Sequence, residues 1–448
     1  MSDMSPMSRE KKKQQLRRHM IVNRDAADSQ IRSEQTADRQ REPDYVRTGS
    51  PNEQEEVNAV KKAHRKVVKK RMILIIFVLL LLAAAAGGVY YWKYYYQFQE
   101  YFVNWEVSLT AGEEGTERSS ANYINFGKNV LKYTKDGASY IDNKGKTVWV
   151  QTYEMKAPIA VVNGTFAAIA DQQGNSIYIF NEEGSQGVAA TLLPIVRIAI
   201  SGKGIVAAAQ EDAKSSYVSM FKRDGSDLKL TMKSTLSKNG YLMDLSFSPD
   251  GTQLICSYAY IDSGSLRSRV VIYDYSDEVG ANLPDRIVSA NEEAFADKVV
   301  PRVQYLSETE SFACSDRGLA FFSSENRANP ALTVQTEEER IESLFYSDKY
   351  VGLVTANSAG PEPEKLVVYR SSGTKVFETG LDYSYTSANI DGENVILYND
   401  NSCRIYNMKG VEKFAGELDF QISHITSGGL SNQFILTGPQ KMQAITFR

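Results

Sequence analysis

Apolar and polar positions divide the chain into three parts with different patterns. Residues 72–92 read MILIIFVLLLLAAAAGGVYYW and contain no charged side chain. A helix rises ~1.5 Å per residue, so a helix of this length covers about 30 Å, the thickness of a bilayer's hydrocarbon core. The pattern therefore predicts one transmembrane helix, with a span of about 72–92. The residues before it are polar, and those after it alternate between short apolar runs and polar turns.

The polar part before the span divides again into a tail and a helix start. Residues 1–49 have almost no aromatic side chains, so they can bury little apolar surface, which predicts a mostly disordered basic cytoplasmic tail. Ser50 and Glu53 form a capping box around Pro51, which predicts that a helix begins there and continues into the span. We expect three parts: a tail over 1–49, a juxtamembrane and transmembrane helix over 50–102, and a folded domain over 103–448.

The distribution of charge predicts how the chain is oriented. Residues 1–71 contain 18 Lys or Arg and 11 Asp or Glu, a net charge of +7, whereas residues 93–448 contain 33 and 44, a net charge of −11. The flank rich in Lys and Arg stays in the cytoplasm. We therefore expect an uncleaved signal anchor in the cell membrane, single-pass, with a cytoplasmic N-terminus and an extracytoplasmic domain. The cations expected to set this topology are Lys61, Lys62, Arg65, Lys66, Lys69, Lys70 and Arg71.

Aromatic residues are concentrated at the other end of the span. Amphipathic aromatic side chains favour the headgroup region of a bilayer, which predicts an interfacial aromatic girdle on the outer face. The alternative is that some of these side chains pack under the outer domain and set its height above the bilayer. The girdle residues are Tyr90, Tyr91, Trp92, Tyr94, Tyr95 and Tyr96.

The third part contains an internal repeat. An apolar or aromatic residue, three polar residues and a glycine recur at a spacing near 40 residues, and each unit holds about four strand-like runs. This period is typical of the four-stranded blades of a β-propeller. The glycine would supply the positive φ that a tight hairpin between the third and fourth strands requires. The glycines in this position are Gly145, Gly184, Gly225, Gly373 and Gly410.

The two ends of the repeat region predict how the propeller closes. The last unit offers only three runs, 422–425, 433–437 and 442–447, whereas the run 103–109 precedes the first complete unit. A strand from the N-terminal run would complete the last blade and remove the exposed sheet edges. We predict an all-β propeller of eight four-stranded blades, with seven as the alternative, and short apolar first strands that are innermost and buried on both faces.

Two units carry insertions. Residues 274–300 include a stretch of helical character, and residues 357–365 contain two prolines. Long loops on a rigid scaffold often carry binding, and a tolerated surface insertion is the alternative.

Two short segments resemble known propeller repeats. Phe247–Thr252 (FSPDGT) is similar to the strand–turn signature of bacterial WD40-like repeats of the TolB type. Asp142–Trp149 (DNKGKTVW) resembles the docking-tryptophan motif of quinoprotein propellers, in which the tryptophan ties neighbouring blades together. The layout of basic tail, anchor helix and extracytoplasmic propeller resembles an uncharacterised bacterial membrane-protein family.

The candidate chemistry favours binding over catalysis. The quinoprotein resemblance implies a dehydrogenase, but the calcium and catalytic residues of that class are not recognisable, so we expect no cofactor and no metal. His424 is the one histidine of the outer domain and is interpreted as a satisfied core residue. Asp400 is interpreted as part of a turn. The three cysteines are interpreted as buried free thiols: Cys256, Cys314 and Cys403.

These observations predict a non-catalytic scaffold that binds an envelope protein or a wall-associated ligand. The alternatives are a transmembrane sensor or assembly factor that signals through the tail and, less favoured, a quinoprotein-type dehydrogenase. The lipid bilayer is the expected partner of the anchor, and no nucleic acid is expected, because no recognition motif accompanies the basic tail.

Overall fold

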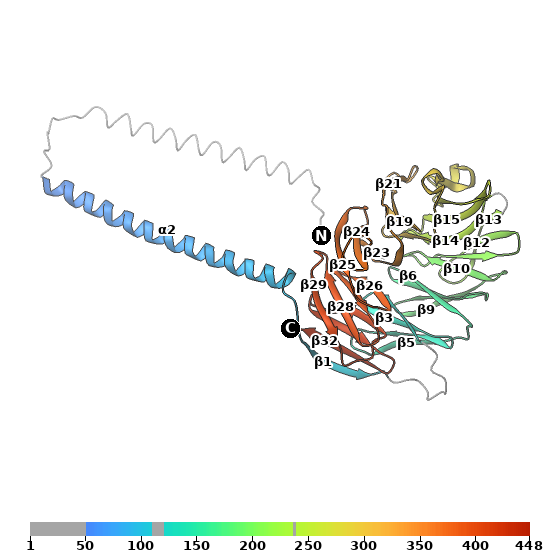
Figure 1. Cartoon of the computed structure of the whole chain (residues 1–448), viewed down its shortest axis with the longest axis horizontal. Coiled ribbons are helices and arrows are strands. Elements are labelled where there is room, and N and C mark those ends of the chain that lie inside the picture. The colour runs from blue at the N-terminus through green and yellow to red at the C-terminus, as the bar shows by residue number, and fades with distance from the viewer. Residues whose placement is uncertain (1–50, 110–120, 236–238) are drawn as a thin grey trace, which may run out of the picture. The chain divides into compact units, whose positions relative to one another are not determined.

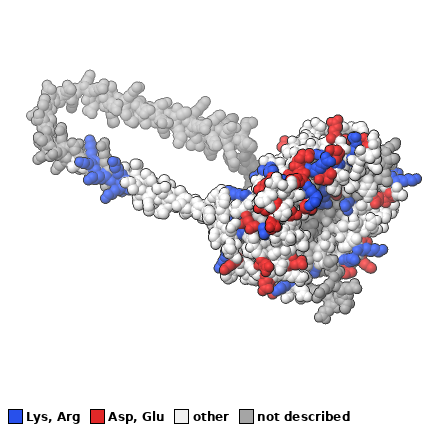
Figure 2. Space-filling model, in the orientation of Figure 1, with Lys and Arg blue, Asp and Glu red and all other residues white. Residues whose placement is uncertain are grey.

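The computed structural model describes residues 51–109, 121–235 and 239–448, and the predicted disorder of the tail over 1–49 lies outside these ranges. The chain divides after Ala86 into two units, of which the second is Gly87–Arg448. One long helix, α2 (Pro51–Tyr94), begins at the predicted capping proline. Its segment Val68–Tyr94 is long and apolar enough to cross a membrane, as a membrane anchor or a signal sequence would be. Figure 2 shows Lys and Arg gathered at the start of this segment.

Gly87–Arg448 is an all-β propeller of eight four-stranded antiparallel sheets, as predicted (Figure 1). Each blade runs in chain order from its innermost to its outermost strand. The strands of blade 1 are β2 (Asn122–Phe126), β3 (Asn129–Tyr133), β4 (Gly137–Ile141) and β5 (Thr147–Thr152). Those of blade 2 are β6 (Pro158–Asn163), β7 (Phe166–Asp171), β8 (Ser176–Asn181) and β9 (Gly184–Ala190). Those of blade 3 are β10 (Ile195–Ile200), β11 (Val206–Glu211), β12 (Ser215–Phe221) and β13 (Asp227–Thr235).

Blades 4 to 7 follow the same order. Blade 4 contains β14 (Tyr241–Phe247), β15 (Gln253–Asp262), β16 (Ser265–Asp274) and β17 (Ile287–Asn291), with short helices η2 (Gly280–Asn282), η3 (Pro284–Arg286) and η4 (Glu293–Phe295). Blade 5 contains β18 (Arg302–Tyr305), β19 (Glu310–Ser315), β20 (Gly318–Ser323) and β21 (Ala331–Gln335). Blade 6 contains β22 (Ile341–Tyr346), β23 (Tyr350–Ala356), β24 (Glu364–Arg370) and β25 (Lys375–Leu381). Blade 7 contains β26 (Ser387–Asp391), β27 (Asn394–Tyr398), β28 (Ser402–Asn407) and β29 (Glu412–Glu417).

Blade 8 closes the propeller with strands from both ends of the repeat region. The order β30 (His424–Ser427), β31 (Gln433–Thr437), β32 (Lys441–Phe447) and β1 (Tyr101–Ser108) confirms that an N-terminal strand completes the last blade. The register of β1 on β32 runs from Tyr101 opposite Phe447 to Ser108 opposite Lys441. The eight-blade prediction and its mode of closure are therefore confirmed.

The repeated glycine has the predicted conformation and a second reason to be small. Four lie between the third and fourth strands of their blades, and Gly184 is the first residue of β9. All five have positive φ: Gly145 (81°), Gly184 (136°), Gly225 (84°), Gly373 (85°) and Gly410 (73°). A Cβ at Gly225 would lie 2.2 Å from the carbonyl oxygen of Val188 in the neighbouring blade. This hairpin therefore needs glycine both for its turn and for the close packing of blades 2 and 3.

One expectation about the core holds only for some blades. The first strands are innermost, but their burial differs: all six residues of β6 are only partly buried, whereas residues 244–247 of β14 are buried on both faces. One edge of each first strand lines an open central channel, so the second strands form the densest layer.

Ring closure predicts that replacing Phe447 by alanine lowers stability much more than replacing Phe102, although both residues lie in blade 8. Phe447 is 1% exposed and stacks on Phe414 at 4.0 Å, whereas Phe102 on β1 is 49% exposed. Phe447→Ala should lower the free energy of unfolding by about 3–5 kcal/mol, because it leaves a cavity where blades 7 and 8 meet. Phe102→Ala should cost less than about 0.5 kcal/mol. Denaturant unfolding of the full chain measures both, and equal losses would argue against closure as the stabilising contact.

Candidate functional site

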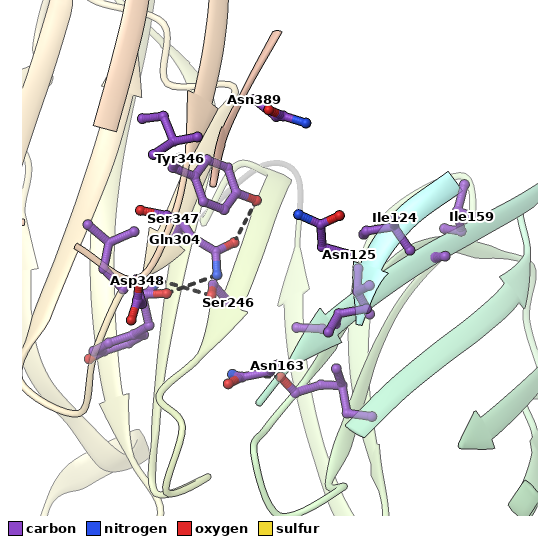
Figure 3. A pocket seen from close by; sticks show the side chains of 18 of the residues that line it. Ile124, Asn125, Ile159, Asn163, Ser246, Gln304, Tyr346, Ser347, Asp348 and Asn389 are labelled. Atoms are coloured by element: carbon purple, nitrogen blue, oxygen red, sulfur yellow. Dashed lines mark hydrogen bonds between the residues drawn. The ribbon is translucent and has the colours of Figure 1, made fainter. Parts of the chain in front are cut away.

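The central channel holds a cavity of about 980 Å³, and the first strand of every blade contributes to its wall. Amides, hydroxyls and short aliphatic side chains alternate on this wall. In Figure 3, Gln304 and Tyr346 lie on one side, and Asn125 and Asn163 extend from the elements opposite. The Tyr346 hydroxyl donates to Gln304 Oε1 at 3.1 Å. The site is therefore concave and polar, and a rigid scaffold shapes it.

Much of this polarity joins one blade to the next. The Asn163 amide donates to the carbonyl oxygen of Ile200 at 3.1 Å, and the Asn389 amide donates to that of Ile425 at 3.0 Å. Ser246 Oγ accepts the backbone N–H of Tyr305 at 3.0 Å. The innermost strand of each blade has an unpaired backbone edge, and side chains from the preceding blade satisfy part of it.

Two carboxylates in the channel are held in the same way. Asp244 is 3% exposed, accepts the backbone N–H of Val303 at 3.0 Å and lies 3.6 Å from Arg302 Nε. Burial raises the pKa of Asp244, and Arg302 opposes that shift. Asp391 accepts the backbone N–H of Ser427 at 2.6 Å, and burial raises its pKa as well. These carboxylates therefore act as inter-blade acceptors.

Other channel groups remain available to a ligand. Arg197 and Asp348 are exposed in the channel and carry opposite charges. The Arg302 guanidinium donates to the Tyr346 hydroxyl at 2.6 Å and lies over that ring at 5.7 Å. A ligand would therefore meet both signs of charge as well as amide donors and acceptors.

The cavity extends to both ends of the first strands, and we call its opening on one rim the mouth. In an antiparallel blade, the turns after the first and third strands lie on one rim, and the turn after the second lies on the other. The lining includes residues of the turns after first strands, namely Gly127, Gly164, Pro249, Ser347, Asp348 and Gly392. The mouth therefore lies on the rim that carries the hairpins between third and fourth strands.

The end of α2 is docked on this same rim. Lys413 is 7% exposed, and its ammonium donates to the carbonyl oxygens of Trp92, Lys93 and Tyr96 at 3.2, 3.2 and 2.5 Å. The Asn407 amide donates to the carbonyl oxygen of Tyr94 at 2.7 Å. A buried cation thus satisfies the carbonyls that a helix leaves unpaired at its C-terminus.

Most of the predicted girdle residues contact the propeller and remain partly exposed. Lys409 Nζ lies 4.5 Å from the ring centroids of Tyr90 and Tyr94 and also contacts the hydroxyl of Tyr90. Trp92 and Tyr96 pack edge-on against buried Phe98 at 6.1 and 5.5 Å. The exposed fractions of Tyr90, Tyr91, Trp92, Tyr95 and Tyr96 are between 40% and 61%.

The predicted topology cations lie on α2. Those whose side chains the structure describes are exposed: Lys61, Lys62, Lys66, Lys69, Lys70 and Arg71. The side chain of Arg65 lies outside the described part.

The docking-tryptophan segment performs the packing role its resemblance implies. Trp149 stacks on Phe180 of the next blade at 4.9 Å, and its Nε1 donates to the carbonyl oxygen of Glu182 at 3.2 Å. Asp142 Oδ1 accepts the backbone N–H of Lys144 and Lys146, which shapes the hairpin before the tryptophan.

The WD40-like segment also ties blades together. Asp250 accepts the hydroxyls of Ser248 and Thr252 at 2.5 Å each in the turn between β14 and β15. Arg327 of blade 5 pairs with Asp250 at 3.4 Å and with Asp274 at 3.2 Å. Asp274 is fully buried, so this turn anchors blade 5 to blade 4.

The remaining candidate residues lie in the core or in a turn. Cys256, Cys314 and Cys403 are buried and free, as predicted. Asp400 lies in the turn between β27 and β28, where its carbonyl oxygen accepts the N–H of Ile422. Within the described ranges, no group of three His, Cys, Asp or Glu side chains is arranged to hold a metal ion.

His424 is a satisfied buried residue, as expected. It is 7% exposed, its Nε2 lies 2.6 Å from Asn125 Oδ1, and its Nδ1 lies 3.3 Å from the Tyr398 hydroxyl. Burial lowers its pKa to about 4. The neutral imidazole therefore joins blade 8 to blades 1 and 7.

Eight blades closed around a polar channel define the class of this protein as a β-propeller. The chain belongs to the family of unknown function DUF5711, which matches residues 94–447. No curated protein matches the sequence.

Solved structures give a distant likeness. BamB from Moraxella catarrhalis aligns at 12% identity and a TM-score of 0.46, covering 78% of this chain and 100% of that one. The Dos1 propeller aligns at 11% identity and a TM-score of 0.47, covering 78% and 94%. The Pan2 WD40 domain from Neurospora crassa aligns at 9% identity and a TM-score of 0.40, covering 78% and 97%. Values this low carry no information about function.

The sequence did not predict the ion pair of Asp244 and Arg302 in the channel or the binding of the α2 C-terminus by Lys413. Asp244 and Arg302 are 58 positions apart in unrelated local patterns, and Lys413 resembles any polar strand residue. The signal that could have found the channel residues was their position in the first strand of each unit, where polar side chains interrupt apolar runs.

The buried imidazole predicts a specific loss of stability in acid. Folding favours neutral His424, whereas the unfolded chain takes up a proton at the ordinary histidine pKa of about 6.5. Its contribution should therefore be complete above about pH 6.5 and decline towards pH 4, by about 3 kcal/mol in total. His424→Gln should flatten this part of the stability-versus-pH curve, measured by denaturant unfolding. His64→Gln on the exposed face of α2 is the control, and identical curves for the wild type and His424→Gln would contradict the assignment.

Proposed function

We propose that this protein is a membrane-anchored extracytoplasmic scaffold that binds an envelope protein or a wall-associated ligand without catalysing a reaction. The observation that carries the proposal is the channel cavity of about 980 Å³, walled by all eight blades of a closed propeller. A rigid concave site with a few fixed polar groups suits selective binding.

The chemistry of the channel wall favours a ligand rich in hydrogen-bonding groups. Gln304, Asn125 and Tyr346 offer both donors and acceptors, and exposed Arg197 and Asp348 offer one charge of each sign. A peptide segment or a wall saccharide has matching groups. The mouth shares its rim with the docked helix end, so such a ligand would enter near the residues clamped by Lys413.

The anchoring proposal rests on the apolar segment Val68–Tyr94 and on the charges before it. Basic residues flank this segment on its N-terminal side, which favours a cytoplasmic N-terminus and an extracytoplasmic propeller.

A labelling experiment tests this orientation. Ser358 lies in the exposed loop after β23, and Ser29 lies in the basic tail. In intact cells, a membrane-impermeant maleimide should label full-length Ser358→Cys but not Ser29→Cys, which should react only after lysis. The buried native cysteines provide the unlabelled background in the wild type. Labelling of Ser29→Cys alone would reverse the topology, and labelling of both in intact cells would contradict anchoring.

A photo-crosslinking experiment tests the binding rim. Ser347 lies at the channel mouth, whereas Ser358 lies on the opposite rim in the turn after a second strand. A photoreactive phenylalanine analogue at position 347 of the full chain should give one predominant adduct in cells, at least tenfold more abundant than any adduct from position 358. Comparable adducts from both positions, or none from position 347, would contradict binding at this mouth.

One observation favours the sensor alternative. Lys413 and Asn407 bind the backbone at the end of α2 directly to blade 7, so a change in the ring could reach the helix. A chain that lacks residues 1–49 separates the two functions. The position-347 crosslink is repeated in this chain, and the chain is tested for rescue of the phenotype of cells that lack the protein. A scaffold keeps both the adduct and the phenotype, whereas a sensor keeps the adduct and loses the phenotype.

A further inference from the structure

A second cavity, of about 640 Å³, lies between blades 3 and 4, outside the central channel. Its walls come from β12 and β13 of blade 3, from β16 and β17 of blade 4, and from the insertion that holds η2 and η3. Small-molecule sites commonly have volumes of about 300–1,000 Å³. The volume therefore suits a small ligand.

Aromatic and aliphatic side chains form part of the wall of this cavity, beside polar and charged ones. Tyr258, Tyr273 and Tyr275 come from one blade, and Leu230 and Met232 come from the other. The hydroxyls of Tyr258 and Tyr273 lie 2.9 Å apart, so they bond to each other. This arrangement presents apolar surface to a flat ligand.

The charged residues that line the cavity are mostly positive, whereas the domain around it is negatively charged. Lys233, Arg269 and Arg286 line the cavity with one carboxylate, Asp285. Residues 93–448 as a whole carry a net charge of −11. Arg269 is already engaged by Glu292 at 3.2 Å, which leaves Arg286 as the guanidinium to consider.

Arg286 lacks the acceptors that a half-buried guanidinium requires. It lies over the ring of Tyr275 at 5.6 Å, and it has no carboxylate within ion-pair distance among the residues that the structure describes. Its Nη1 and the adjacent Tyr275 hydroxyl are both enclosed without a hydrogen-bond partner in the described part of the chain. Each unsatisfied buried group costs about 1–3 kcal/mol.

The hydroxyl of Tyr275 remains a donor at all ordinary pH values. Burial raises the pKa of Tyr275 well above its usual value, and the nearby Arg286 opposes only part of that shift. The two unmatched groups can therefore both donate, and an oxyanion would supply the acceptors that they lack.

The backbone at this end of the cavity is also strained. Asp285 and Arg286 are consecutive residues with φ of 52° and 60°, in the left-handed region that other residues than glycine rarely adopt. Such strain costs of order 1–3 kcal/mol per residue and is concentrated at ligand sites. Here it holds the guanidinium against the tyrosine.

We propose that the cavity between blades 3 and 4 binds a small organic acid, with its carboxylate on Arg286 and Tyr275 and its flat apolar body along Tyr273, Leu230 and Met232. The site is separate from the channel and does not depend on the proposed scaffold function. A carboxylate accepts two parallel bonds from a guanidinium, and the cavity walls remove the apolar body from water.

The probe is a fluorinated biphenyl carboxylate, followed by ¹⁹F NMR with the full chain in detergent micelles and with empty micelles as the blank. We expect saturable binding to one site per chain. Arg286→Gln should weaken the affinity at least tenfold, and Tyr275→Phe about threefold or more. Arg223→Gln is the matched control, because Arg223 is exposed on the hairpin between β12 and β13, does not line the cavity and loses the same charge.

The fluorinated biphenyl carboxamide has the same shape without the charge and should bind at least tenfold more weakly than the carboxylate. Equal loss in Arg286→Gln and Arg223→Gln, equal affinity of acid and amide, or no binding above the micelle blank would each overturn the proposal. If Arg286→Gln does not fold, the proposal is overturned when Tyr275→Phe has unchanged affinity and the acid and the amide bind equally.

Discussion

The pairing of β1 with β32 is the interaction on which the rest of this structure depends. Seven β blades can each form from a continuous segment, but the eighth exists only when Tyr101–Ser108 aligns with Lys441–Phe447. Without this pairing, β32 would present an open edge, and the ring would have two unmatched blade faces. The aromatic cluster of Phe98, Phe414 and Phe447 then seals the junction between blades 7 and 8.

The closed ring accounts for the chemistry inside the channel. Innermost strands have one backbone edge without a partner strand, and the ring brings these edges close enough for side chains to cross between blades. Asn163, Asn389, Asp244 and His424 all make such crossings. Polar residues in the first strands are thus required by the architecture before any ligand is considered, and the groups left over, such as Arg197 and Asp348, define what a ligand can meet.

Most of the fold could be predicted from the sequence because its signals are local or periodic. The repeated glycine in five of the eight units, the spacing of the units and the missing strand in the last unit were enough to predict eight blades and their closure. Burial of the first strands was predicted correctly for β14 but not for β6, because an apolar run such as Ile159–Val162 has the same pattern whether it faces a core or a channel.

The candidate sites were mostly beyond such reasoning. They depend on side chains brought together from distant blades, such as Asp244 with Arg302, or from a helix end and a strand, such as Tyr96 with Lys413. No local pattern encodes these pairs. His424 was the exception, since a lone histidine in an apolar run already indicated a buried, satisfied residue.

The position of β1 has a consequence for the order of events during synthesis. β1 follows α2 and precedes the strands of the other seven blades in the chain, whereas its partner β32 is the last of the propeller's strands. Asn104 and Thr446, which bond to each other across this pair, are 342 residues apart in the chain. Seven blades must therefore assemble while β1 waits with an unpaired edge, and closure joins the most distant contacts of the domain last. An unpaired strand edge can pair with a wrong partner, so β1 is the strand of a nascent propeller of this kind that is open to mispairing for longest.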